Sequence, residues 1–430
     1  MQIKLPKENK IFFYFLFLFF ILRIIAAYFI GRGAVPEDDS FWYNNYALTI
    51  LKGTYWLKSA DFLGSLREPG YPIFIAITYF LFGKENFFAV YVFQALINTL
   101  TIFIIYKLAF KVFDKKVAFL AFFWSGLYGF YLFFNSQLIR EVLICLFIVL
   151  FFYFCYLWLN NISIKDIFFA SLFYFLLIHT DCRYLYLLPC IFILLLIYKN
   201  LIKGISEFLV FMFIVIILSM PWVMRNYKVY HNFVLINSYY FKPESNVIKG
   251  FKFAEHITRK PVINITNNPD YPSDKERALI KRGQNPNNRS AAEIAAITSN
   301  VYPPSTFWGR AFFHCKQLWM PCMFSGAYTP FPFCKFIKYS FRHNVISLIF
   351  YGTLLPFVFI GFIMLTVKSK KIFLFFFLPT FLHTLIHALT WGEYRFRVPI
   401  DFFLIILAAF GIITAYNYLC KYLKIKNFTW

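Results

Sequence analysis

The most constraining feature of the sequence is a series of apolar runs, most about 20 residues long and many ended by lysines. A bilayer core roughly 30 Å thick needs about 20 apolar residues per helix, so runs of this length predict membrane-spanning helices. Hydrophobic residues make up 60% of the 430-residue chain, which leaves too little polar surface for a soluble domain. We therefore predict an all-α, polytopic transmembrane helix bundle. The runs predict about ten spans, at residues 11–30, 87–110, 117–135, 141–159, 166–180, 184–199, 205–224, 344–367, 372–390 and 398–419.

The charge of the short loops sets the predicted orientation of the spans. The apolar segment 71–83 has only 13 residues, a length more typical of an interfacial or re-entrant helix than of a span. If it does not span, the lysine-rich loops and both termini all lie in the cytoplasm, as short basic loops usually do. Residues 31–86 are therefore predicted to form one long outer loop that carries short interfacial helices.

The formal charge of +23 does not indicate a nucleic-acid-binding protein. Much of the excess lies in short cytoplasmic loops, where lysines set orientation and contact anionic membrane lipids. The other ionisable residues gather at span ends on the opposite face. Ionisable residues at these boundaries are costly, so their convergence on one side favours a functional site. The alternative, that each residue ends a helix in the headgroup region, is equally favoured for any single residue.

The chain divides into three predicted parts. Residues 1–225 form an N-terminal transmembrane module that includes the outer loop 31–86. Residues 226–343 form a large extracytoplasmic loop with interfacial helices, because this is the one long hydrophilic region. Residues 344–430 supply the C-terminal transmembrane helices and a cytoplasmic tail.

The outer loop contains a spaced motif after its first acidic residues. Asp39, Tyr43 and Ala47 are four residues apart, so they share one face of a predicted helix that Gly53 ends. Asp39 opens this helix. By spacing alone, a role for Asp39 as a helix N-cap is favoured over a catalytic role.

Five segments together resemble one known family. The pattern D-x3-Y-x3-A-x3-L-x-G at residues 39–53 resembles the first outer loop of GT-C glycosyltransferases, particularly family 39 proteins similar to protein O-mannosyltransferases and lipid A aminoarabinose transferases. The other matching segments follow in the same order: REPGYPIFIAITYFLFG at 67–83, SQLIREVLICLF at 136–147, PWVMRNYKVYHNFVLINS at 221–238 and HALTWGEYRFRVP at 387–399. The chain departs from the family at Ser40, where Glu is frequent, and at Phe396, where the family has Tyr between two arginines.

The resemblance implies a GT-C-like membrane glycosyltransferase, a hexosyl- or pentosyltransferase that uses a polyprenyl-phosphate-linked sugar on the outer face with inversion. A carboxylate can take the proton of an acceptor hydroxyl, and arginine matches phosphate oxygens in pairs. The predicted catalytic residues are Asp39 and Glu141. The predicted donor-phosphate ligands are Arg67, Arg183, Arg225, Arg395, Arg397 and His387. The predicted substrate-lining residues are Asp38, Tyr43, Tyr71 and Tyr394.

Several alternatives stay open. His387 in an apolar helix is more often a packing residue than a ligand, and aromatic residues at span ends are more often membrane anchors. No cofactor is certain, although Asp39 and Glu141 are candidates to share a divalent cation. The acceptor is a lipid, a glycan or a protein, and the expected location is a bacterial inner membrane with the site facing the periplasm or exterior. A lipid-linked sugar flippase or transporter, and an O-antigen ligase or polymerase, are the competing functions.

Overall fold

The computed structural model describes residues 10–31, 39–53, 67–160, 163–230, 233–236, 274–288, 306–321, 341–390 and 392–423. These residues contain helices and no strand, which confirms the predicted all-α class. The helices of the N-terminal half are α1 (Lys10–Gly31), α2 (Asp39–Leu51), α3 (Gly70–Phe82), α4 (Phe87–Val112), α5 (Lys115–Leu127), α6 (Gly129–Asn135), α7 (Glu141–Asn160), α8 (Ile164–Ile178), η3 (Cys182–Tyr186), α9 (Leu187–Tyr198) and α10 (Leu201–Tyr230). Those that follow are α12 (Asp274–Lys281), α14 (Phe307–Trp319), α16 (Phe341–Phe350), η4 (Gly352–Leu354), α17 (Leu355–Lys368), α18 (Lys370–Leu389), α19 (Tyr394–Arg397), η5 (Val398–Ile400) and α20 (Asp401–Tyr422).

The protein is an integral membrane protein, because seven of the described helices, or eight with one bent pair, are long and apolar enough to cross a bilayer. The predicted count of about ten spans is not confirmed. Predicted spans 166–180 and 184–199 form α8 and α9, which have only 15 and 12 residues. Predicted span 117–135 forms α5 and α6, which are bent by 46° at the break between them.

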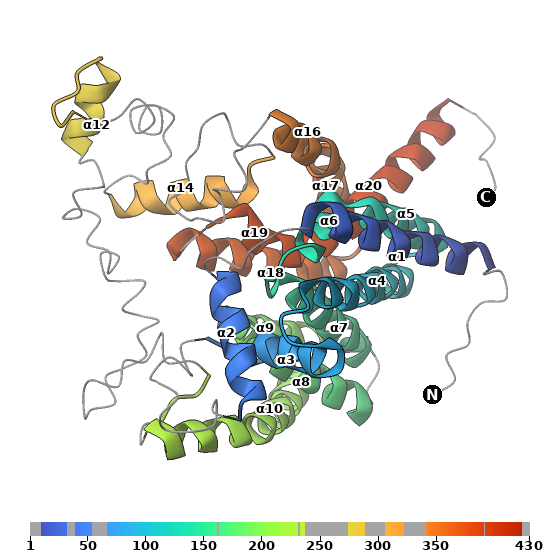
Figure 1. The fold of residues 1–430 in the computed structure, drawn as a ribbon. Helices are drawn as coiled ribbons and strands as arrows, with labels where there is room; N and C mark the ends of the chain where they lie inside the picture. Colours follow the sequence, from blue (N-terminus) through green and yellow to red (C-terminus); the bar gives the residue numbers. More distant parts are fainter. Residues whose placement is uncertain are drawn as a thin grey trace.

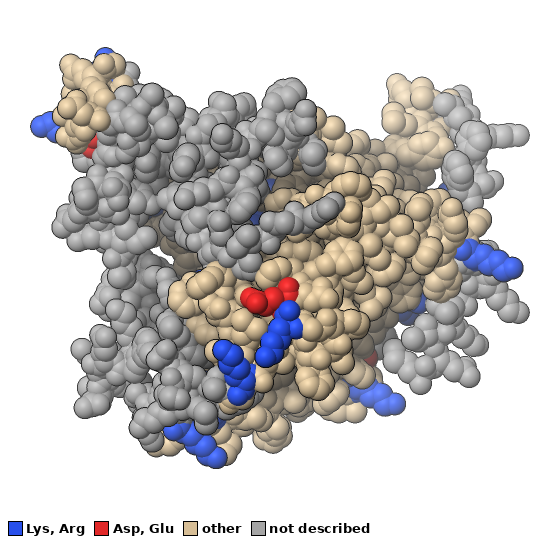
Figure 2. All heavy atoms as spheres, viewed as in Figure 1, with Lys and Arg blue, Asp and Glu red and all other residues tan. Residues whose placement is uncertain are grey.

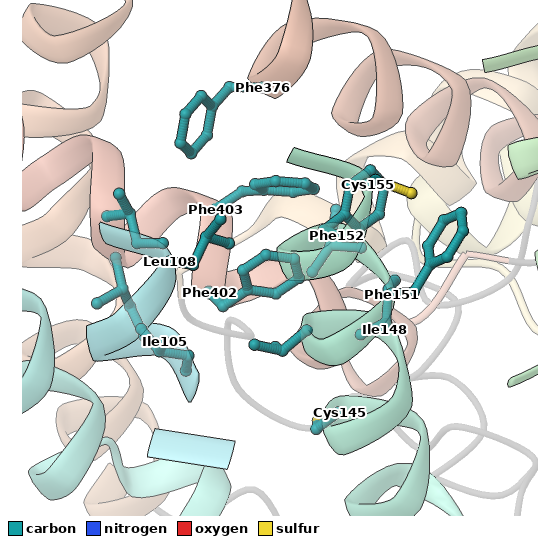
Figure 3. Close-up of a cluster of buried hydrophobic side chains, with 14 of the residues drawn as sticks. Ile105, Leu108, Cys145, Ile148, Phe151, Phe152, Cys155, Phe376, Phe402 and Phe403 are labelled. Atoms are coloured by element: carbon teal, nitrogen blue, oxygen red, sulfur yellow. The ribbon is translucent and has the colours of Figure 1, made fainter. Parts of the chain in front are cut away.

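The core of the bundle lies around α7 and α20. The most apolar 18-residue stretch is 78% buried in α7 and in the run Tyr394–Tyr422 that ends with α20. In α1 and in α10 it is only 22% buried, as expected of helices that face lipid. Figure 3 shows Phe152 of α7, Phe376 of α18 and Phe403 of α20 among the packed rings at the centre. Most of the described surface in Figure 2 carries neither acidic nor basic side chains, as expected of helices surrounded by lipid.

A buried arginine accounts for the break between α5 and α6. Arg23 of α1 is fully buried, and its guanidinium donates to the carbonyl oxygens of Ser125 and Gly126 at the end of α5, at 3.3 and 3.0 Å. A helix end leaves carbonyl groups without intrahelical donors, and a cation there is favourable. Arg23 lies inside the predicted span 11–30, where hydropathy gives no sign of this role.

Helices α2 and α3, from the segment that the sequence predicts to be an outer loop, pack together, and α3 also contacts α4 (Figure 1). The predicted common face of α2 is confirmed, because Tyr43 and Ala47 are buried. The helix ends at Leu51, and Gly53 follows with a φ of +71°, a conformation that favours glycine. The segment 71–83 forms the 13-residue helix α3, and whether it spans the membrane stays a prediction.

Gly70 brings the start of α3 against the turn that follows α8. Its backbone N–H donates to the carbonyl oxygen of His179 at 2.8 Å. A Cβ atom at this position would lie 2.6 Å from Thr180 Oγ1 and 2.9 Å from His179 O, so no larger residue fits without a shift. The glycine of the REPGYP segment is therefore explained by this close approach.

Candidate active site

The candidate site is centred on Asp39, the first residue of α2. Its Oδ1 atom accepts a hydrogen bond from Arg67 Nη2 at 2.6 Å, and its Oδ2 atom accepts one from Arg395 Nη2 at 3.0 Å. Arg67 precedes α3, and Arg395 lies in α19, more than 300 residues further along the chain. Three segments that are remote in sequence thus meet at one carboxylate. Its side chain is 15% exposed, so the cluster is half-buried rather than sealed.

Glu141, the first residue of α7, lies on the other side of Arg395. Its Oε1 atom is 3.7 Å from Arg395 Nε, and Glu393 Oε2 is 3.5 Å from the same nitrogen. The carboxylate is buried at the start of a helix, where a negative charge is favourable. The two residues that the sequence predicts to be catalytic are therefore joined through one guanidinium group.

Two buried polar atoms near these charges have no hydrogen-bond partner among the described residues. They are the Oε2 atom of Glu141 and the hydroxyl of Tyr43, whose side chains are 3% and 2% exposed. Buried polar groups are almost always satisfied by protein, water or a ligand. Both residues adjoin the Asp39 cluster, because Glu141 lies 3.7 Å from Arg395 Nε and Tyr43 follows Asp39 by one turn on the buried face of α2.

Burial by itself would raise the pKa of the Asp39 carboxyl, but Arg395 and Arg67 outweigh burial and lower the pKa to about 2. Asp39 is consequently ionised at neutral pH. Its contribution to folding stability is present above its ordinary pKa and is lost as the pH falls through about 2. While both arginines donate to it, the carboxylate is a weak base.

A second ion-pair network links the segment that carries Arg67 to the segment that carries Arg183. Arg140 pairs with Glu68 at 2.7 Å and with Asp181 at 3.3 Å, and Asp181 in turn accepts from Arg183 Nε at 2.9 Å. Glu68 also accepts from the backbone N–H of Cys182 at 2.9 Å. These contacts fasten the residue after Arg67 to the turn that carries Arg183. The Arg183 guanidinium lies 3.9 Å from the centre of the Phe396 ring.

Two of the predicted phosphate ligands lie in other surroundings. Arg225 of α10 lies 5.0 Å from the Trp222 ring and donates to Asn226 at 2.8 Å. Arg397 is fully buried and donates to Asp401 at 2.9 Å, beneath the Tyr351 ring. The contacts of Arg397 suit a structural role in the bundle better than phosphate binding, and those of Arg225 do not place it in the Asp39 cluster.

The PWxxRN segment holds the chain that follows α10. Trp222 Nε1 donates to the carbonyl oxygen of Ile236 at 2.6 Å, and Asn226 donates to that of Val234 at 3.0 Å. The predicted boundary between residues 225 and 226 falls inside α10, which continues to Tyr230.

The remaining predicted residues take different positions. Tyr71 is fully buried, and its hydroxyl donates to Gln94 at 2.7 Å, so it does not line an open site. Tyr394 packs against Phe130, with 5.9 Å between the ring centres. His387 is buried and stacks on the Phe396 ring at 5.2 Å. Asp38 lies outside the described residues.

No three His, Cys, Asp or Glu side chains in the described part of the chain are grouped so as to hold a metal ion. Asp39 and Glu141 instead share Arg395, whose guanidinium places a positive charge between them. A divalent cation shared by the two carboxylates stays a prediction.

Sequence reasoning missed His383 and Tyr186. His383 is fully buried on α18, where its ring is 4.4 Å from that of His387. The four-residue spacing of these histidines, which places both on one helix face, was the available signal. Nothing in the sequence around Tyr186 marks it.

Comparisons with known proteins support the sequence resemblance. Residues 67–224 match the family model described as dolichyl-phosphate-mannose-protein mannosyltransferase. The solved oligosaccharyltransferase of Archaeoglobus fulgidus, tethered with an acceptor peptide that contains the NVT sequon, superposes with a TM-score of 0.57 at 14% identity, covering 98% of this chain and 51% of that one. The archaeal oligosaccharyltransferase AglB from the same organism, in complex with an inhibitory peptide and a dolichol-phosphate, gives 0.55 at 14% identity, covering 97% and 52%.

The chain has the GT-C fold. It resembles the protein mannosyltransferases over residues 67–224, a range that includes Arg67, Glu141 and Arg183 but not Asp39 or Arg395. It spans about half the length of the two oligosaccharyltransferase chains. ArnT from Cupriavidus metallidurans bound to undecaprenyl phosphate gives a TM-score of 0.46 at 13% identity, covering 96% of this chain and 63% of that one, a similarity too weak for inference. No curated protein sequence matches significantly.

Proposed function

We propose that this GT-C protein is a membrane glycosyltransferase that transfers a sugar from a polyprenyl-phosphate donor to a hydroxyl or phosphate of an acceptor. The observation that carries the proposal is the position of Asp39 between Arg67 and Arg395, with Glu141 on the same guanidinium. This arrangement combines a base and phosphate-binding cations in one half-buried place. The family match and the GT-C fold support the same reaction class.

The donor phosphate is held by Arg67, Arg183 and Arg395. Their side chains are 34%, 18% and 15% exposed, so each keeps part of its guanidinium accessible to a ligand. Arginine binds phosphate oxygens through two parallel N–H groups, and these bonds strengthen as negative charge grows on the leaving phosphate. AglB was solved in complex with a dolichol-phosphate, which is consistent with a lipid phosphate as a ligand of this fold.

Asp39 acts as the general base. The acceptor oxygen attacks the anomeric carbon as its proton passes to the Asp39 carboxylate, and the bond from that carbon to the phosphate oxygen breaks. The electron pair leaves with the polyprenyl phosphate, where the arginines stabilise it. Attack from the face opposite the phosphate inverts the configuration of the anomeric carbon.

Glu141 and Tyr43 position the reactants. Glu141 Oε1 lies 3.7 Å from Arg395 Nε and so helps to orient that guanidinium, while its buried Oε2 atom is suited to accept a hydrogen bond from a substrate hydroxyl. The Tyr43 hydroxyl is suited to donate to a substrate oxygen. A site of this kind binds a neutral polyhydroxylated group next to the phosphate.

The site faces the side opposite the basic loops. The junction of α4 and α5 carries Lys111, Lys115 and Lys116. It lies at one end of α4, and the predicted outer loop lies at the other end, one membrane crossing away. Short lysine-rich loops stay in the cytoplasm, so we place the site on the extracytoplasmic face, in the inner membrane of a bacterium, where it faces the periplasm or exterior.

The proposal is tested with purified protein in lipid nanodiscs, labelled polyprenyl-phosphate sugar and an extract of cell-envelope acceptors. We expect Asp39→Asn to abolish sugar transfer without loss of the inserted, folded protein. Asp166→Asn, which changes a carboxylate in the first turn of α8, is the matched control and should transfer at the wild-type rate. Wild-type activity in Asp39→Asn would remove Asp39 from the base role.

The acceptor is identified by comparing glycolipids, polysaccharides and glycoproteins from cells with and without the intact protein. A glycan that disappears in the deletion strain and returns with wild-type protein, but not with Asp39→Asn, supports transfer. Loss of transport without loss of any glycosidic linkage would instead indicate a lipid-sugar flippase.

A further inference from the structure

The carbonyl group between the two C-terminal arginines is held by a buried histidine. His383 Nε2 lies 3.0 Å from the carbonyl oxygen of Phe396, and the Tyr186 hydroxyl lies 2.8 Å from His383 Nδ1. A carbonyl oxygen only accepts hydrogen bonds, so Nε2 carries the proton and donates it. Nδ1 then accepts from the Tyr186 hydroxyl. The two contacts together fix one tautomer and one orientation of a fully buried ring.

The residue held in this way, Phe396, contacts two arginines of the candidate site. The centre of its ring lies 3.9 Å from the Arg183 guanidinium and 4.9 Å from that of Arg395. His387 stacks on the same ring, with an angle of 20° between the two planes. Arg183 comes from η3 and Arg395 from α19, so Phe396 is the common support of two cations that enter from different elements.

The same two elements supply both ends of the hydrogen-bond chain. Tyr186 is the last residue of η3, three residues after Arg183, and Phe396 follows Arg395 directly. His383 of α18 therefore links η3 to α19 at the level of the two arginines. Bonds that fix a ring and a backbone carbonyl in a buried place are stronger constraints than packing alone.

We propose that Tyr186 and His383 are positioning residues for the donor phosphate: through Phe396 they hold the guanidinium groups of Arg183 and Arg395, which both contact its ring, in place to bind that phosphate. This inference rests on the proposed function. Phosphate recognition by two guanidinium groups depends on their geometry, and misplacement by about 1 Å is enough to weaken such a site strongly.

Three substitutions separate this role from simple packing. His383→Met keeps a side chain of similar length but removes both hydrogen bonds. His383→Gln places an amide N–H where it can still donate to the Phe396 carbonyl. Tyr186→Phe removes the hydroxyl that donates to Nδ1, so that only the bond to the Phe396 carbonyl then orients the His383 ring.

Thr380→Val is the matched control. Thr380 is a buried polar residue one turn before His383 on α18, and its hydroxyl bonds only to Phe376 of its own helix among the contacts described. This change costs one buried hydrogen bond without touching Phe396.

The readouts are the Kd for a polyprenyl monophosphate in nanodiscs and the melting temperature of the same samples. We expect His383→Met to weaken binding about 10-fold or more, the loss that follows when one charge-assisted hydrogen bond is misplaced. Tyr186→Phe should give a smaller loss. His383→Gln and Thr380→Val should stay within about 2-fold of wild type, which is the range expected when no such bond is lost.

Wild-type affinity in His383→Met, or an equal loss in Thr380→Val, would overturn the inference. If His383→Met does not fold, the comparison of Tyr186→Phe with Thr380→Val decides, and equal affinities overturn it. A wild-type protein that does not bind polyprenyl phosphate would overturn the proposed donor class itself, a result distinct from any difference among the variants.

Discussion

Asp39 and the donor phosphate are expected to compete for the same two arginines. Both carboxylate oxygens are occupied, one by Arg67 and one by Arg395. A phosphate that takes either guanidinium must draw it away from Asp39. Donor binding would thereby release the carboxylate and make it a better base at the moment when the acceptor needs one.

The strength of this competition follows from the pKa of Asp39. Burial raises that pKa and the arginines lower it, and the net change is from 3.8 to about 2. A change of this size corresponds to roughly 2 kcal/mol of net stabilisation of the ionised carboxylate. Replacing Asp39 with Asn removes this charge, because the amide is neutral. The amide oxygen can still accept a hydrogen bond from one arginine, but its N–H groups face the other.

We therefore expect Asp39→Asn to bind a polyprenyl monophosphate more tightly than wild type, by about 10-fold, although it no longer transfers sugar. The full 2 kcal/mol would give roughly 30-fold, and the contact that the amide retains reduces this. Binding is measured by isothermal titration calorimetry in nanodiscs at pH 7.5 and constant salt, because exposed charges are screened.

Two other variants calibrate the result. Glu393→Gln removes a carboxylate 3.5 Å from Arg395 Nε and should raise affinity less than Asp39→Asn. Asp166→Asn, remote from the cluster, should not change it. Equal or weaker binding by Asp39→Asn, when the wild-type protein binds, would refute the competition.

Three further predictions concern the residues around this cluster. Arg395→Lys should weaken polyprenyl phosphate binding about 10-fold in the same titration, because an ammonium group cannot replace two parallel N–H donors, and unchanged affinity would remove Arg395 from the donor site. Arg397→Met should lower the free energy of unfolding by roughly 3–5 kcal/mol, since it leaves the buried Asp401 carboxylate without its cation and only with the Tyr128 hydroxyl. The double variant with Asp401→Leu should recover much of this loss in thermal unfolding, and no recovery would contradict the pairing. Burial, then Arg310, lowers the pKa of His314 to about 4. The unfolded state therefore binds more protons between about pH 4 and 6.5, and the free energy of unfolding falls by up to roughly 3 kcal/mol as the pH is lowered through that range. His314→Gln should flatten the dependence of melting temperature on pH, and an unchanged slope would assign that dependence to other groups.

The sequence predicted the long helices well because they depend on local patterns. Apolar runs mark α1, α4, α7, α10 and the C-terminal helices, and the spacing in α2 identified its buried face. The motifs also predicted one site from Asp39, Arg67, Glu141 and Arg395; these side chains lie within 4 Å of one another in pairs, and their catalytic and binding roles stay predictions.

The rest depended on contacts that no local pattern encodes. The break between α5 and α6 needs Arg23 of α1, about 100 residues away in the chain. Arg395 and Arg397 belong to the same motif, yet Arg397 lies two residues further along the helix and therefore points toward Asp401 inside the bundle. His383 and Tyr186 act through a backbone carbonyl, an atom that every residue has.

The bond between Asp39 and Arg395 joins residues that are 356 positions apart. During synthesis α1 to α18 leave the ribosome before Arg395 does, so the carboxylate must wait, ionised and paired at most with Arg67, until almost the whole chain has been inserted. Contacts of such large separation form late because closing the intervening loop costs entropy. The protein is thus expected to acquire its activity only in the final stage of its biogenesis, and stalled or shortened nascent chains would be inserted yet inert.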